Sequence, residues 1–255
     1  MLSSFLNKTR WIRIFFFKVV FRLFRNRLYP YKDILRGKTI LIVGNGPSLN
    51  RTPLDSFNCP SIGMNKINLI FSRVKWRPSY IVCNNGLVMR QAKNVYKGLE
   101  IPIFLDFKGL VLGLWGKHIS YFLTRREDSF SDDFTLGVGA SATVTYTALQ
   151  LAYYMGASKI ILVGIDHRFK GFNSDKSIQR IERYKGVDDN HFDPNYFKNK
   201  YWGIPDLHDS EKGYNNAKIF FEEQGVEIYD ATIDGALEVF TKISIENAME
   251  MCNHD

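Results

Sequence analysis

One stretch of sequence decides the fold of this chain: Thr39-Ile40-Leu41-Ile42-Val43-Gly44-Asn45-Gly46-Pro47-Ser48. Its residues 40–43 form a short apolar run, mostly β-branched, which is typical of a strand buried on both faces of a parallel sheet. Gly44 and Gly46 then permit a tight turn with a close backbone approach. Pro47 and Ser48 suit the start of a helix. Together these features favour a phosphate site, because free N–H groups and the helix dipole point at the ligand.

The glycine pattern narrows the type of site. A Gly-x-Gly turn also occurs in α/β proteins without a ligand, so a purely structural role stays open. No third glycine completes the dinucleotide fingerprint Gly-x-Gly-x-x-Gly. The Walker sequence Gly-Lys-Ser/Thr does not follow this turn either. We therefore predict a nucleotide site that is neither an NAD site nor a P-loop, lined by Gly44, Asn45, Gly46, Pro47 and Ser48.

The positive charge of the chain is concentrated at its N-terminus. The 255 residues carry a net charge of +8 and suit either one large α/β domain or one domain plus a lid. Residues 1–38 hold ten Lys and Arg against one acid, Asp33, so this segment carries +9 and the remainder carries −1. A nearly neutral body argues against a nucleic-acid surface. We predict an N-terminal arm over residues 1–36, a nucleotide-binding domain over 37–245 and a tail over 246–255.

The arm has the pattern of an amphipathic helix. Aromatic side chains and cations alternate in residues 1–28, and the longest apolar run, Ile14 to Phe17, is too short to span a membrane. On a helix, one face would hold Leu2, Phe5, Ile12, Phe16, Val19, Val20 and Leu23, with Lys18, Arg22 and Arg25 opposite. This pattern favours the surface of an anionic membrane. The alternative is packing on the domain or on a second subunit.

The cysteines indicate the compartment. Cys59, Cys83 and Cys252 are odd in number and far apart in sequence, and no Cys-x-x-Cys occurs. We predict a reduced, cytoplasmic chain without a disulfide framework or a zinc site. Taken with the basic arm, this predicts a protein that is peripheral on the cytoplasmic face of the inner membrane.

Strand-like and helix-like segments alternate along the body. Apolar runs predict strands at 40–43, 61–64, 80–83, 101–107, 159–165 and 226–229, with helices at about 137–155 and 210–224. This order predicts an α/β, Rossmann-like, doubly wound and mostly parallel sheet. Polar residues end several strands: Asn65, Asn84, Asn85 and Asp166. Each of them could be only a turn residue or a helix cap. At one edge of a parallel sheet, however, they would converge on a ligand crevice.

A long segment with little periodicity follows Asp166. A structureless stretch of this length, about residues 167–209, is typical of a lid. Its His191 is the best-placed general base, with Asp188 and Asp189 close by in sequence. A lone histidine is more often a surface or core residue, so that alternative stays open.

Several of these motifs together resemble two related families. They are 43–49 (Val-Gly-Asn-Gly-Pro-Ser-Leu), Met64-Asn65, 139–143 (Gly-Ala-Ser-Ala-Thr) and 162–166 (Leu-Val-Gly-Ile-Asp). One family is the bacterial sialyltransferases of glycosyltransferase family 42. The other is the 6-hydroxymethylpterin diphosphokinase MptE-like domain family.

The sialyltransferase resemblance implies a CMP-sugar donor, a glycan or glycolipid acceptor, metal-independent inverting transfer and commonly a homo-oligomer. It implies that residues 45–48 line the nucleotide site and that Asn65 with Asn84 or Asn85 contacts the nucleotide. The region from Ser141 to Thr143 would meet the donor phosphate or carboxylate, and residues 188–191 match the catalytic histidine motif of the lid. His167 and Arg168 replace tyrosines of that family.

The MptE-like resemblance implies transfer of diphosphate from ATP to a pterin with Mg²⁺, for which Asp166, Asp188 and Asp189 would be ligands. A basic amphipathic arm suits a lipid-linked acceptor better than a soluble pterin. Our first hypothesis is therefore a membrane-associated glycosyltransferase of cell-surface polysaccharide or lipopolysaccharide synthesis, without a cofactor, in which His191 deprotonates the acceptor. The alternatives are the diphosphokinase with Mg²⁺ and a non-catalytic module that recruits partners to the membrane.

Overall fold

The computed structural model describes residues 19, 21–125, 127–171 and 181–254. The strands are β1 (Thr39–Val43), β2 (Ser61–Met64), β3 (Tyr80–Cys83), β4 (Ile103–Asp106), β5 (Ile119–Phe122), β6 (Lys159–Val163), β7 (Ile181–Arg183), β8 (Tyr201–Gly203), β9 (Glu227–Asp230) and β10 (Thr241–Lys242). The α-helices are α2 (Gly86–Gln91), α3 (Lys93–Gly98), α4 (Lys108–Val111), α5 (Val144–Tyr154), α6 (Leu207–Gln224) and α7 (Ile245–Asn253). Short 3₁₀ helices occupy Arg25–Arg27, Tyr29–Tyr31, Pro47–Arg51, Leu54–Ser56, Ile67–Ile70 and Phe134–Leu136.

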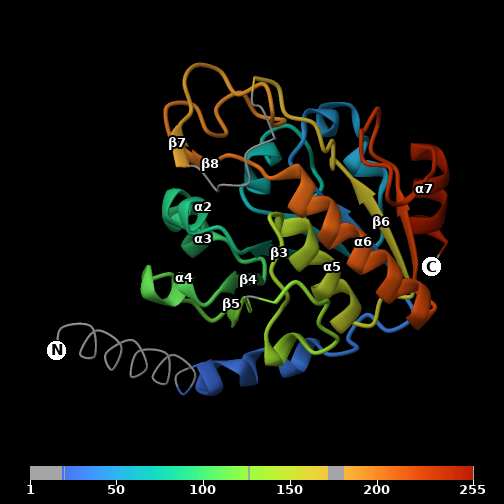
Figure 1. The fold of residues 1–255 in the computed structure, drawn as a ribbon, viewed down its shortest axis with the longest axis horizontal. Coiled ribbons are helices and arrows are strands. Elements are labelled where there is room, and N and C mark those ends of the chain that lie inside the picture. Colours follow the sequence, from blue (N-terminus) through green and yellow to red (C-terminus); the bar gives the residue numbers. More distant parts are fainter. Residues whose placement is uncertain (1–18, 20, 126, 172–180, 255) are drawn as a thin grey trace.

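Eight strands form one sheet in the order β10-β9-β6-β1-β2-β3-β4-β5, and all their pairings are parallel (Figure 1). From β1 the chain builds outward through β5 and then returns to place β6 on the other side of β1. The direction of strand order therefore switches between β1 and β6, where ligands bind in doubly wound sheets. The predicted α/β Rossmann-like fold is confirmed. The sequence pattern missed β5 and β10, which are short edge strands.

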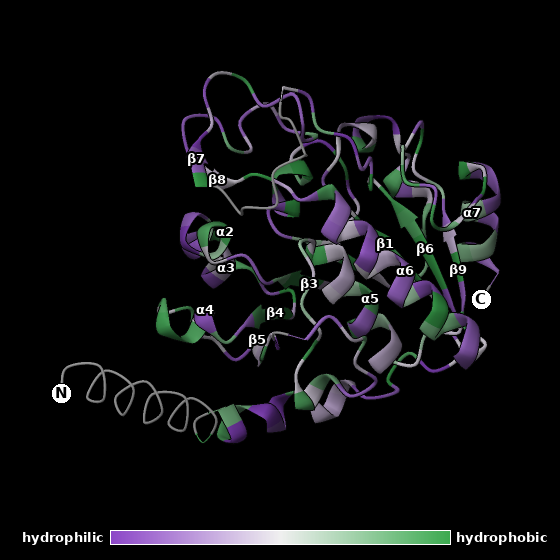
Figure 2. Ribbon diagram, viewed as in Figure 1, coloured by the Kyte–Doolittle hydropathy of each residue, from purple (hydrophilic) through white to green (hydrophobic). Residues whose placement is uncertain are grey.

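Nearly all residues of the central strands β1 and β6 are buried, and Figure 2 shows β6 as a green, hydrophobic arrow. Ile40 and Ile42 belong to a core that also contains residues of α5 and α6, such as Leu149 and Phe221. Leu41 and Val43 belong to the core on the opposite face, with residues of α2, α3, α7 and the lid. Burial on both sides explains why this strand reads as an unbroken apolar run.

The segment that the sequence predicts to be a lid, called the lid below, lies between β6 and α6. Its described part contains only a two-stranded antiparallel hairpin, β7 with β8. Helix α6 begins at Leu207, where the Asp206 side chain accepts a hydrogen bond from the Asp209 amide. A capping carboxylate thus begins the helix slightly earlier than residue 210, the start expected from the apolar pattern.

Both ends of the body extend beyond the predicted boundaries. In the arm, Phe21 and Leu28 are buried in the two cores, and the Tyr154 hydroxyl donates to the Leu28 carbonyl at 3.2 Å. Residues 1–18 and 20 lie outside the described residues, so most of the predicted amphipathic face does too. At the other end, the predicted tail is helix α7, which buries Ala248 against the core.

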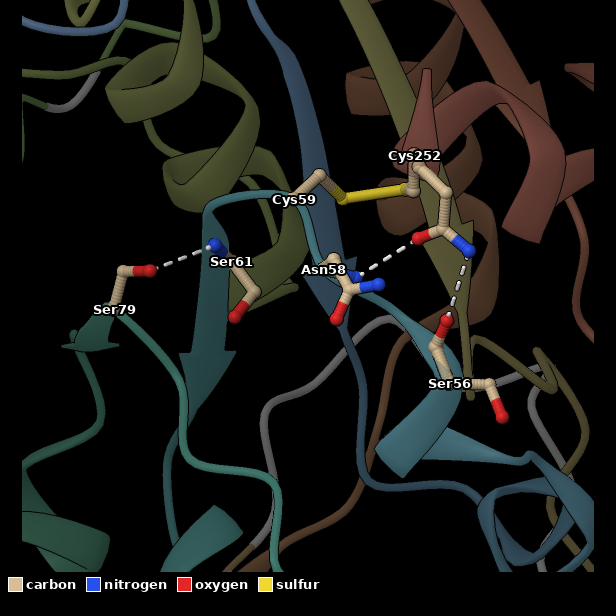
Figure 3. Close-up of a disulfide and its surroundings, with 7 residues drawn as sticks. Ser56, Asn58, Cys59, Ser61, Ser79 and Cys252 are labelled. Carbon is tan, nitrogen blue, oxygen red and sulfur yellow. Dashed lines mark hydrogen bonds between the residues drawn. A yellow bond between two sulfur atoms is a disulfide. The ribbon is translucent and has the colours of Figure 1, made fainter. Parts of the chain in front are cut away.

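A disulfide joins Cys59, just before β2, to Cys252 of α7, with their Cα atoms 4.9 Å apart (Figure 3). Beside it, the Asn58 amide donates to Asn253 Oδ1 at 3.1 Å, and Asn253 Nδ2 donates to the Ser56 carbonyl at 3.2 Å. The expectation of a chain without a disulfide is therefore wrong. The two cysteines are far apart in the sequence, but the packing of α7 beside β1 brings them together.

In the described part of the chain, no helix is both long enough and apolar enough to cross a membrane.

Candidate functional site

The ends of β1 and β6 meet closely at the carboxyl edge of the sheet. The Gly44 amide donates to the Val163 carbonyl at 2.8 Å, and the Gly46 amide donates to the Gly164 carbonyl at 2.9 Å. A Cβ on Gly44 would lie 2.2 Å from the Gly164 oxygen, and one on Gly46 would lie 1.9 Å from an Asp166 oxygen. Gly44 is thus required for the close contact of two backbone segments, and Gly46 leaves room for the Asp166 side chain.

At the helix start after β1, the Asp166 carboxylate accepts hydrogen bonds from Ser48, and Ser48 does not act as the helix cap. Pro47 begins a helix as predicted, but it is a 3₁₀ helix, Pro47–Arg51, without a side-chain cap. Ser48 donates its amide and its hydroxyl to the two Asp166 oxygens, at 3.0 and 2.6 Å. Burial raises the pKa of Asp166, and the hydrogen bonds from Ser48 oppose that rise. Asp166 therefore occupies the position at this helix start where the sequence suggests a phosphate.

The strand-end asparagines have different local roles. Asn45 Nδ2 donates to the Met64 carbonyl at 3.1 Å, and Asn84 Nδ2 donates to Thr147 Oγ1 at 3.0 Å. The Asn85 side chain caps α2 by accepting from the amides of residues 87 and 88. Asn65 has a left-handed backbone, with φ at 49°, which asparagine tolerates better than most residues. All four asparagines lie at the ends of their strands, at the carboxyl edge of the sheet.

Helix α5 supplies a second helix N-terminus at the same edge. Thr143 caps it, because its hydroxyl oxygen accepts from the Thr145 amide at 3.2 Å. The same oxygen lies 3.3 Å from the hydroxyl of Tyr214 on α6. Nearby, the Ser141 hydroxyl donates to the Asp209 carbonyl at 3.1 Å. The positive end of the α5 helix dipole thus lies at the same edge of the sheet as the Gly-x-Gly turn.

In the lid, His191 and Asp188 form a hydrogen-bonded pair. His191 Nδ1 lies 3.0 Å from both Asp188 carboxylate oxygens. The Asp188 side chain is fully buried and also accepts from the amides of Asn190 and Phe197. The imidazole stacks on the Tyr196 ring at 4.0 Å between centroids. Because a carboxylate accepts, the Nδ1 atom carries the proton, and the lone pair of the neutral ring is on Nε2.

The lid is attached to the body next to His191. The Phe192 amide donates to the Asn45 carbonyl at 3.0 Å, and Asn50 Nδ2 donates to the Phe192 carbonyl at 2.9 Å. These two bonds join the lid directly to the turn after β1. His191 is therefore fixed above the strand ends, as the sequence order alone could not show.

Lys66, which the sequence analysis did not single out, supports this attachment. Its Nζ atom donates to the Tyr196 carbonyl at 2.7 Å and to Gln91 Oε1 at 2.5 Å. The ammonium also lies 4.3 Å from the centre of the Phe197 ring. Burial, with the charge of Lys200 as the next cause, lowers the pKa of Lys66 to about 7. The sequence signal that could have identified Lys66 is its position next to Asn65, just after a buried strand.

Two cavities meet at His191. The first, of about 200 Å³, lies above β1 and β6 and is lined by most of the predicted residues: Gly44, Asn45, Gly46, Asn65, Asn84, Asn85, Thr143, Asp166 and His191. The second, of about 430 Å³, shares Asn65, Asn84, Asn85 and His191 with the first and adds Ser141. Arg168, which the sequence analysis named only as replacing a tyrosine, also lines the first cavity, together with two residues that it did not name, Ser210 and Tyr214. The last two belong to α6, and the apolar pattern of that helix does not identify them as cavity residues.

Four predicted residues do not line either cavity: Pro47, Ser48, Asp188 and Asp189. Asp189 is exposed, and the imidazole bonds to Asp188 instead. The oxygens of Asp166 and Asp188 are held by Ser48 and His191, respectively. Across the described residues, no group of three His, Cys, Asp or Glu side chains is arranged to hold a metal ion. The three aspartates proposed for Mg²⁺ therefore do not fit as one ligand set.

The chain is similar to solved structures of the sialyltransferase CstII from Campylobacter jejuni. With the complex containing the substrate analogue CMP-3FNeuAc, the TM-score is 0.47 at 13% identity, over 81% of this chain and 86% of that chain. With the complex containing cytidine-5'-monophosphate, the TM-score is 0.43 at 12% identity, over 82% and 86%. No protein-family model and no curated protein matches the chain, so membership of the MptE-like family is not supported. At these identities and TM-scores the structural likeness carries no weight for the reaction, and any function must be argued from the site.

Proposed function

We propose that this protein is a metal-independent glycosyltransferase that moves a sugar from a nucleoside monophosphate donor to a glycan hydroxyl at a membrane surface. The observation that carries the proposal is the position of His191 between two cavities, with Nδ1 bound to Asp188. One cavity then holds the donor and the other holds the acceptor. The sequence resemblance to family 42 sialyltransferases agrees with this assignment and favours a CMP-sugar.

The reaction needs one base and one leaving group. His191 Nε2 takes the proton from the acceptor hydroxyl, and the resulting oxygen forms a bond to the anomeric carbon. The bond from that carbon to the phosphate oxygen breaks, and its electrons leave with the nucleoside monophosphate. Asp188 stabilises the imidazolium that forms, because its carboxylate is already bound to Nδ1. Attack from the face opposite the leaving group inverts the configuration.

The first cavity suits a monophosphate. Of the described residues that line it, Arg168 is the single Lys or Arg, and α5 begins on the same wall with Thr143 and Val144. One guanidinium and one helix N-terminus balance a single phosphate better than a diphosphate.

The second cavity suits a sugar acceptor. Its lining combines aromatic side chains, among them Phe169, Phe197 and Trp202, with polar groups of Asn65 and Ser141. Aromatic faces pack on the apolar faces of sugar rings, while amides and hydroxyls bond their hydroxyl groups. Because His191 lines this cavity too, an acceptor hydroxyl bound there can reach the base.

Membrane association belongs to the same proposal. The arm carries most of the positive charge, and two residues of its predicted apolar face, Val19 and Leu23, are exposed in the described part. Such a surface favours an anionic bilayer. A lipid-linked acceptor would then be presented at the membrane.

Thermal unfolding of the full chain with added nucleotides tests the proposal. The full chain is required, since removing residues 1–28 would also remove the core residues Phe21 and Leu28. CMP at ~100 times its dissociation constant should add ~2.7 kcal/mol of stability without a metal. Arg168→Gln should reduce this shift, while Lys170→Gln, an exposed neighbour, should not. Stabilisation only by ATP or ADP with Mg²⁺ would point to diphosphoryl transfer, and binding without turnover of any nucleotide sugar would point to a non-catalytic module.

A further inference from the structure

A short apolar segment protrudes from the folded domain at the edge of the sheet. Residues 108–117 read Lys-Gly-Leu-Val-Leu-Gly-Leu-Trp-Gly-Lys and form α4 with the loop that leads to β5. Val111 is 67% exposed and Trp115 is 68% exposed, although both are large and apolar. Figure 2 shows α4 as a green, hydrophobic element at the edge of the molecule. Exposed apolar side chains that gather at one place mark an interaction surface.

This segment lies against the arm. The Phe21 ring meets the Phe107 ring edge-on at 5.7 Å, directly before α4. At the other end of the segment, Arg27 donates to the Gly116 carbonyl at 2.8 Å. The arm residues between these contacts include Leu23, which is 73% exposed. The arm therefore contacts the α4 segment at two places, through Phe21 and through Arg27.

Basic residues predominate in the sequence of this surface, although Lys108 Nζ lies 3.7 Å from Oδ1 of the buried Asp106. Residues 107–126 contain Lys108, Lys117, Arg125 and Arg126 and neither Asp nor Glu. Residues 1–32 also contain neither Asp nor Glu. The indole N–H of Trp115 donates to the Leu110 carbonyl at 3.0 Å, so the ring is held in place with its donor satisfied. Lysines that border exposed Trp and Val are typical of a protein face that enters the headgroup region of an anionic bilayer.

We propose that Leu23, Val111 and Trp115 form a membrane-contacting rim, by which the folded domain itself docks on an anionic lipid bilayer. The proposal deepens the membrane association stated above, because it names a folded surface that acts together with the arm. A second copy of the chain would be a poorer occupant, since like charges would face each other across the contact. A docked rim also fixes the orientation of the site above the membrane, whereas a charged arm alone would not.

Co-sedimentation of the full chain with lipid vesicles tests the rim. Vesicles of phosphatidylcholine mixed with phosphatidylglycerol are compared with vesicles of phosphatidylcholine alone. The double variant Val111→Ser, Trp115→Ala should bind the anionic vesicles about tenfold more weakly than the unchanged chain. Ile219→Ser, which removes an exposed apolar side chain of α6, is the matched control and should bind normally. Unchanged binding by the double variant would overturn the proposal.

Two further measurements separate this result from other causes. Lys117→Glu reverses one positive charge next to the rim and leaves the apolar side chains of the rim unchanged. It should weaken binding to the anionic vesicles. Retained stabilisation by CMP in each variant would show that the fold is intact. If CMP fails to stabilise even the unchanged chain, the proposed reaction fails, but the vesicle result still decides the rim. If the double variant loses only concentration-dependent self-association and keeps vesicle binding, the surface is a contact between copies and the proposal is wrong.

Discussion

The amide of Phe192 donates a hydrogen bond to the carbonyl of Asn45 at 3.0 Å, which joins the lid to the turn after the first strand. The bond places His191, the preceding residue, above the edge where β1 and β6 end. Because both groups belong to the backbone, many side-chain substitutions would leave the bond in place. The candidate base and the predicted nucleotide turn are thus directly connected through the backbone.

The first prediction concerns the base. His191→Ala should lower glycosyl transfer by about 10²–10⁴ while CMP still stabilises the protein, since general-base catalysis contributes that much. Asp188→Asn should also lower transfer, because it removes the carboxylate bound to Nδ1. Asp189→Asn is the matched control, as its side chain is exposed and is not bonded to the imidazole. Initial rates with CMP-sugar donors measure all three. An equal loss in Asp188→Asn and Asp189→Asn would contradict the assignment.

The fold could be predicted further than the site. The apolar run of β1 and its glycines identify a central strand, because such a strand must be apolar on both faces and its turn must avoid a Cβ. The roles of Ser48 and Asp166 could not be predicted, since each is a common turn residue and only the tertiary contact selects their bond. The Cys59–Cys252 disulfide could not be predicted either, because the two residues are far apart in the sequence and only the packing of α7 brings them together.

A second prediction tests the close approach of β1 and β6. Gly44→Ala should destabilise the fold by about 1–3 kcal/mol or more, because its Cβ would lie 2.2 Å from the rigid Gly164 carbonyl oxygen. Gly98→Ala is the control, since no atom lies within 4 Å of the added Cβ. Urea unfolding of both variants measures the difference. Equal stability of the two would show that the strand ends are farther apart than described.

A third prediction concerns the disulfide that fastens α7. Cys252→Ser should lower the free energy of unfolding by about 2–4 kcal/mol, because the bond closes a long loop in the unfolded chain. A reducing agent should lower the melting temperature of the unchanged chain but not that of the variant. Thiol titration in denaturant checks the pairing directly. It should find only Cys83 reactive before reduction, and three reactive thiols at that stage would refute the bond.

The last prediction concerns the buried Lys66 beneath the lid. Burial lowers its pKa from 10.5 to about 7, so between these values the unfolded chain binds one more proton than the folded chain. Stability should therefore rise with pH across this window, by up to about 1.4 kcal/mol per pH unit from this group. Lys66→Met removes this contribution. The free energy of unfolding of the unchanged chain, minus that of Lys66→Met, should increase from about pH 7 toward about pH 10.

Urea unfolding at several pH values measures that difference, with two controls. Lys200→Met should move the onset of the increase to higher pH, because repulsion from Lys200 helps to lower the pKa of Lys66. Lys198→Met removes an exposed charge of the same lid and controls for net charge alone. A difference that does not change with pH would mean that Lys66 is solvated, and that the lid is not held through its bond to the Tyr196 carbonyl. Below pH 7 Lys66 is protonated in both the folded and the unfolded chain. The difference in unfolding free energy there reports the cost of burying the ammonium group, offset by the hydrogen bonds that this group makes.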